Sequence, residues 1–209
     1  MSAALETLLR HPAIWRGAAL APETAALPSG FPELDAELPG GGWPRGALTE
    51  IQPAAEGIGE LRLALPALVA LTREGAWAAL IAPPHQPYAP AFAAAGVVLS
   101  RLLVVRATGA RDRLWAAEQA LRAPVCGVVL AWLPGIAESE VRRLQLAARE
   151  GGGCGVLYRE AGSAAHSTWA ALRLSLQPTA AGLEVRILKR RGGVASGVVR
   201  VAAAWAGFS

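Results

Sequence analysis

A chain of 209 residues is long enough to bury a sizeable core and suits one α/β domain. Hydrophobic residues make up 53% of it, yet charges and prolines interrupt every apolar run before it reaches the roughly 18 residues of a membrane helix. The N-terminus lacks a signal-peptide pattern, and the net charge of +4 comes almost entirely from arginine. We therefore expect a cytoplasmic protein that makes no membrane contact.

The first part of the chain is predicted to be a helix over residues 3–9, followed by a proline-containing segment up to residue 28. Residues 27–46 concentrate prolines and glycines, but Phe31, Leu34, Leu38 and Trp43 interrupt them with side chains typical of a core. This pattern indicates an ordered loop rather than a flexible linker.

Short apolar runs then alternate with helical periodicity. Strands are predicted at residues 47–52, 77–83, 101–107, 126–133 and 154–160, and helices at 61–74, 90–95, 112–122 and 138–150. This alternation indicates an α/β fold whose twisted central sheet is mainly parallel and flanked by helices. The last runs, at 170–178, 183–191 and 197–205, are joined by turns and predict an antiparallel C-terminal extension.

The two cysteines, Cys126 and Cys154, lie in apolar runs, with no histidine or second cysteine nearby at the spacing of metal ligands. We expect small buried thiols and no metal site.

Several segments, in this order, resemble the RecA fold. Residues 29–51, SGFPELDAELPGGGWPRGALTEI, are similar to the lead into the RecA phosphate loop. Residues 80–97 are similar to the stretch that carries its catalytic glutamate, and VCGVVLAW (125–132) to the strand that ends in its Walker B aspartate. Together with GIGELRLALPAL, LWAAEQALR and RRLQLAAREGG, they resemble the ImuA family, RecA-like accessory proteins of bacterial error-prone translesion synthesis. The resemblance implies an N-terminal helical arm (1–27) and a RecA-like core (28–209).

The phosphate loop of this core is degenerate. Gly57 and Gly59 keep the backbone of a phosphate cradle, but Glu60 replaces the lysine that binds the outer phosphates. Leu61 replaces the hydroxyl residue that ligates magnesium. Two further positions also lack the residues of an ATPase. The resemblance puts Pro84 at the position of the catalytic glutamate and Ala131 at the position of the Walker B aspartate. We expect a pseudo-ATPase with no catalytic residue, no cofactor and no metal, in which Trp132 is a candidate to fill the vacated cleft.

The two loops that bind DNA in RecA are short here, at residues 133–138 and 159–168. Neither combines aromatic and basic residues, so we expect direct DNA binding to be weak or confined to an assembled complex. His166 in the second loop and His85 in a proline-rich loop are interpreted as solvated side chains.

The resemblance implies RecA and ImuB as partners and, through ImuB, an error-prone DNA polymerase in the SOS response to DNA damage, with nucleoid association during that response. In the arm, Leu8, Ile14 and Trp15 are apolar candidates for docking on a partner or on this chain's own core. Lys189, the only lysine, with Arg190 and Arg191, forms a basic strand end that either meets a RecA protomer or faces solvent.

Two alternatives stay open. The chain also resembles the cell-division inhibitor SulA, a smaller protein of the same superfamily. The other alternative is an unconventional ATP-binding protein, for which Arg62 in the helix after the loop is the available cation.

Overall fold

The computed structural model describes residues 26–160, 168–191 and 197–202. The predicted helix at 3–9, the arm residues Leu8, Ile14 and Trp15, and His166 lie outside the described residues. No helix in the described ranges is long and apolar enough to cross a lipid bilayer.

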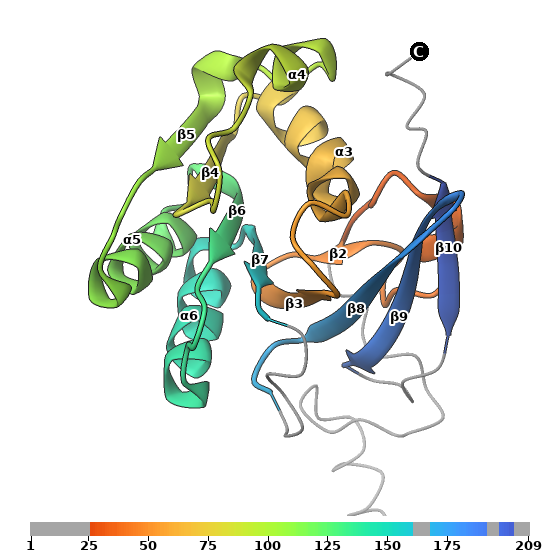
Figure 1. Cartoon of the computed structure of the whole chain (residues 1–209). Helices are drawn as coiled ribbons and strands as arrows, with labels where there is room; N and C mark the ends of the chain where they lie inside the picture. The colour runs from red at the N-terminus through yellow and green to blue at the C-terminus, as the bar shows by residue number, and fades with distance from the viewer. Residues whose placement is uncertain (1–25, 161–167, 192–196, 203–209) are drawn as a thin grey trace, which may run out of the picture.

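One eight-stranded sheet organises the molecule, in the order β10-β9-β8-β3-β7-β6-β4-β5 (Figure 1). Its parallel strands are β3 (Ala47–Pro53), β4 (Trp77–Ile81), β5 (Leu102–Val105), β6 (Cys126–Trp132), β7 (Cys154–Tyr158) and β8 (Leu172–Thr179). The antiparallel strands β9 (Gly182–Arg190) and β10 (Val198–Ala202) complete it. The predicted α/β class, the mainly parallel sheet and its antiparallel extension are confirmed. The antiparallel part begins only at β9, because β8 pairs with β3 in parallel.

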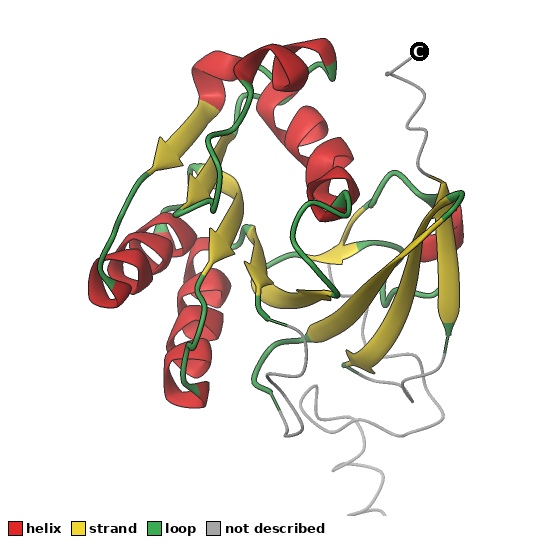
Figure 2. Ribbon diagram, in the orientation of Figure 1, coloured by secondary structure: helices red, strands yellow, loops and turns green. Residues whose placement is uncertain are grey.

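Helices cover both faces of the parallel strands, as Figure 2 shows. On one face lie α3 (Glu60–Arg73) and α4 (Ala89–Ala94), and on the other α5 (Ala110–Arg122) and α6 (Glu138–Gly151). Successive strand residues point to opposite faces. In β6, Leu130 therefore joins the core under α3, and Val129 joins the core under α5 and α6. The near-continuous apolar runs of the sequence result from this burial on both sides.

The turn-rich loop before β3 is ordered, as predicted. It contains β1 (Ala26–Leu27), α2 (Pro32–Asp35) and β2 (Trp43–Pro44), and β1 pairs with β2. Leu34 and Trp43 of this segment are buried in the core that includes α3. Gly30 adopts a φ of 85°, and a Cβ there would come within 2.5 Å of the Pro66 Cβ in α3. Glycine at this position therefore lets the loop pack directly on α3.

Candidate functional site

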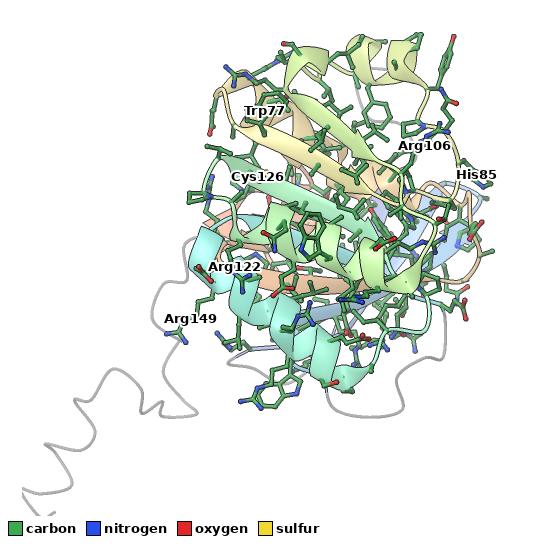
Figure 3. The ribbon with its side chains drawn as sticks, turned by 90° about the vertical axis from the view of Figure 1, so that its left-hand side faces the viewer. Trp77, His85, Arg106, Arg122, Cys126 and Arg149 are labelled. Carbon is green, nitrogen blue, oxygen red and sulfur yellow. The ribbon has the colours of Figure 1, made fainter. Side chains whose placement is uncertain are left out.

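A cavity of about 840 Å³ opens at the carboxyl ends of the parallel strands. The residues that follow β3, β4, β5, β6 and β7 line it, including Ala54, Ala82 and Arg106. In Figure 3, His85 and Arg106 lie on this side of the sheet, opposite Trp77 and Cys126 at the amino ends of β4 and β6. Open α/β sheets bind ligands at this edge, so the cavity, which we call the cleft, is the candidate site.

The turn between β3 and α3 keeps the backbone of a phosphate cradle. Gly57 and Gly59 have φ values of 79° and 97°, a region that glycine enters without strain. The Gly57 N–H donates a long hydrogen bond of 3.4 Å to Oε1 of Glu60, the first residue of α3. The Glu60 carboxylate thus accepts a hydrogen bond from a backbone amide of the turn. In a working phosphate loop, the amides of this turn would bind a phosphate.

The other predicted replacements lie around this turn. Leu61 packs partly buried against the core, and Pro84 lines the cleft after β4. Ala131 is buried on the opposite face of the sheet, among residues of α5 and α6. None of these three side chains offers a cation, an acid or a hydroxyl to the cleft.

An aromatic pair forms one wall of the cleft. Trp132 of β6 and Tyr158 of β7 are register partners, and their rings stack with centroids 4.7 Å apart and planes 14° from parallel. The Tyr158 hydroxyl donates to the Glu60 carbonyl at 3.4 Å. Burial, reinforced by the Glu60 carboxylate, raises the pKa of Tyr158, so the phenol stays protonated. Trp132 therefore forms part of the cleft wall, and the cleft that it lines stays open.

The cleft carries charges of both signs. Glu56 and His85 approach to 3.6 Å at the mouth, where both side chains are exposed. Arg106 and Arg113 line the end nearest β5, where the Arg113 Nε donates to the Ala107 carbonyl at 2.9 Å. Arg62, the cation of the unconventional ATP-binding alternative, lines a separate small cavity with Pro178 and Leu183 instead of the cleft.

A buried ionic network adjoins the cleft, which its Arg159 helps to line. Glu50 of β3 is fully buried, and its carboxylate contacts the Arg159 Nη1 at 3.0 Å and the Arg173 Nε at 2.8 Å. The Thr168 hydroxyl donates to the same carboxylate at 2.8 Å. Arg159 also reaches Glu138 at 3.4 Å, at the start of α6. The sequence did not predict this network, and the available signal was a charged residue, Glu50, in a strand that is otherwise uncharged.

The predicted basic strand end is partly engaged within the chain. The Lys189 ammonium donates to the Thr168 carbonyl. The Arg190 Nη1 donates to the Glu37 carbonyl at 2.7 Å, while the Arg191 side chain is exposed. Whether these residues bind a partner stays a prediction.

The cysteines are as expected. Cys126 and Cys154 are buried free thiols, and burial raises the pKa of Cys154 to about 11. Among the described residues, no group of three His, Cys, Asp or Glu side chains is placed to hold a metal ion.

Comparison with known proteins identifies relatives of the chain. The family model described as "MT3502 N-terminal domain" matches residues 36–163, more than half of the chain. The cell division inhibitor SulA of Edwardsiella piscicida is 36% identical over 100 residues, which span 47% of this chain and 60% of that protein. The crystal structure of SulA from Pseudomonas aeruginosa superposes on 54% of this chain and 97% of its own, with 25% identity and a TM-score of 0.46.

Proposed function

Because the chain belongs to the MT3502 N-terminal domain family and is related in sequence to SulA, we propose that it is a non-catalytic RecA-like accessory protein of the DNA-damage response. In this proposal it acts in error-prone translesion synthesis through contacts with RecA and ImuB, and through ImuB with the polymerase. It works in the cytoplasm, at the nucleoid during the response. The observation that carries the proposal is the Glu60 carboxylate at the phosphate-loop turn.

Glu60 opposes nucleotide binding by its charge. Two unit charges 4 Å apart interact by about 4 kcal/mol at an effective dielectric constant near 20. The lysine of a working phosphate loop would attract a phosphate with an energy of about 4 kcal/mol, whereas a carboxylate at the same position would repel it with an energy of similar size. The stacked Trp132 and Tyr158 rings line the same cleft beside this turn. These features support a pseudo-ATPase that keeps the fold as a binding surface.

The edge of the sheet supports a role in protein contacts. Strand β5 pairs only with β4 among the described strands, so its outer N–H and C=O groups are unpaired by the sheet. Leu103 and Val104 of this strand are 46% and 37% exposed. An exposed apolar edge strand accepts a strand from another chain by β-augmentation.

Calorimetric titration tests the absence of nucleotide binding. We expect no heat of binding with ATP and magnesium at 1 mM nucleotide, about the upper end of typical enzyme KM values. Magnesium-dependent binding in the micromolar range would refute the pseudo-ATPase proposal and favour the ATP-binding alternative.

A binding panel with RecA, ImuB and single-stranded DNA, each alone, tests the partners. We expect RecA or ImuB to bind and DNA to bind weakly. Val104→Lys should weaken protein binding at least tenfold, whereas Val198→Lys, on the edge strand at the other end of the sheet, should not. Binding of neither protein would overturn the proposal.

Cell-division inhibition is the second candidate, because the named relative at 36% identity is a cell division inhibitor. The chain matches 60% of that relative's length, so its activity is here only a proposal. The discriminating measurement is GTP-dependent assembly of the tubulin-like division protein with increasing amounts of this chain. Inhibition at equimolar ratio, with no binding of RecA or ImuB, would favour this candidate.

A further inference from the structure

A third cavity, of about 360 Å³, lies between the end of β9 and the segment that leads into β8. We call it the β9 pocket, and its lining residues are Thr168, Trp169, Ala170, Ala171, Lys189 and Arg191. Small side chains and the Trp169 ring supply apolar surface, and the two basic side chains supply positive charge. The pocket therefore combines an apolar wall with a cationic one.

The surroundings of the β9 pocket hold an excess of positive charge. Among the described residues, the linked cluster contains four cations, Arg159, Arg173, Lys189 and Arg191, and two carboxylates, Glu50 and Glu138. Both carboxylates already contact arginines of the network. An anion at the pocket would lower the repulsion among these cations.

The pKa of Lys189 is consistent with this excess of positive charge. Partial burial lowers the pKa of the Lys189 ammonium, and repulsion by Arg173 and Arg191 lowers it further. A carboxylate bound beside Lys189 would supply an opposite charge and favour the protonated amine.

Trp169 is the exposed apolar anchor of the β9 pocket. It is 52% exposed, and the Arg142 guanidinium of α6 lies 4.8 Å from the centre of its ring. The guanidinium covers one face of the ring, so the exposed remainder of Trp169 is the surface that a ligand can contact. The same arginine adds a third cation at the rim, where it can meet an acidic side chain.

We propose that the β9 pocket binds an acidic peptide segment of a partner protein, with an apolar side chain against Trp169 and carboxylates at Lys189 and Arg191. The inference deepens the proposed function by giving the chemistry of one protein contact. The alanine lining suits a peptide side chain, and the net charge of the cluster requires negative charge in the ligand.

Fluorescence anisotropy with labelled peptides tests the pocket directly. The probes are the acidic peptide Asp-Asp-Leu-Phe-Asp, the basic peptide Lys-Lys-Leu-Phe-Lys and an oligothymidine of eight nucleotides. All three carry the same fluorescent label. We expect the acidic peptide to bind, more weakly at high salt, and the basic peptide not to bind.

Substitutions in the pocket test whether the acidic peptide binds there. Arg191→Ala and Trp169→Ala should each weaken the acidic peptide at least fivefold. Arg186→Ala, an exposed arginine of β9 outside the pocket lining, should leave it unchanged. Arg191 and Trp169 are exposed side chains, and a thermal melt of each variant verifies folding.

No binding of the acidic peptide, equal loss in Arg186→Ala, or tighter binding of oligothymidine with the same dependence on Trp169 and Arg191 would each overturn the inference. The last outcome would assign the pocket to single-stranded nucleic acid. Since the assay contains neither RecA nor ImuB, failure of the proposed function and failure of this pocket are separate results.

Discussion

Replacing Glu50 by glutamine removes the only fully buried carboxylate of the ionic network while keeping the shape of the side chain. Glu50 is 0% exposed and accepts from Arg159 and Arg173 at 3.0 and 2.8 Å. In Glu50→Gln, two buried guanidinium groups lose their common counter-ion. Breaking a buried ion pair from one side costs about 3–5 kcal/mol. In a chain of this size, each kcal/mol lowers Tm by about 2–4 °C, so we expect a fall of about 6–20 °C.

Urea unfolding followed by circular dichroism measures the change in the free energy of unfolding. Glu184→Gln is the matched control, because Glu184 forms a partly exposed pair with the exposed Arg186 at 3.8 Å, and pairs at the surface contribute about 0–1 kcal/mol. Combining Glu50→Gln with Arg159→Leu should cost less than the two single changes added together, by about 0.5–3 kcal/mol. A loss below about 1 kcal/mol in Glu50→Gln would refute the view that the network depends on this charge.

Three further predictions concern the cleft, a thiol and a turn. Glu60→Lys combined with Leu61→Thr should bind pyrophosphate at least tenfold tighter than the native chain in calorimetry; no gain would mean that charge is not what prevents binding. Burial raises the pKa of Cys154 from 9.0 to about 11, so the native chain should lose up to about 3 kcal/mol of stability between pH 9 and pH 11 from this thiol. In urea unfolding at each pH, Cys154→Ala should lose less free energy of unfolding between pH 9 and pH 11 than the native chain. The same dependence of that free energy on pH in both proteins would contradict the prediction. A Cβ at Gly42 would lie 2.1 Å from the Leu27 carbonyl oxygen, so Gly42→Ala should cost about 1–3 kcal/mol, and a melt within 1 °C of the native chain would contradict this.

Local patterns in the sequence were sufficient to predict most of the fold. Strands β3, β4, β6 and β7 are short and largely buried, so their apolar runs stand out in the sequence. Helix α6 begins near the predicted residue 138 and ends at Gly151, beside the predicted glycine stop. The parallel pairing of β8 with β3 was not predicted, because an apolar run carries no information about which strand lies beside it.

The site was predicted less completely, because its contacts join distant parts of the chain. Glu50 is 109 residues from Arg159 and 123 from Arg173, and no spacing rule connects them. The Trp132 and Tyr158 stack depends on the register of β6 and β7, which the sequence does not specify. The degenerate turn was predictable, since Gly57, Gly59 and Glu60 are adjacent in sequence.

The position of β3 at the middle of the sheet has a consequence for folding. Leu48 pairs with Gly155 and Ile51 pairs with Leu174, so both neighbours of this first parallel strand are made much later on the ribosome. During synthesis, the edges of β3 cannot both pair until the chain up to β8 has left the ribosome. Such long-range pairing slows folding and prolongs exposure of apolar strand edges. The nascent chain is therefore most vulnerable to aggregation, and most dependent on chaperones, before residues 172–179 are released.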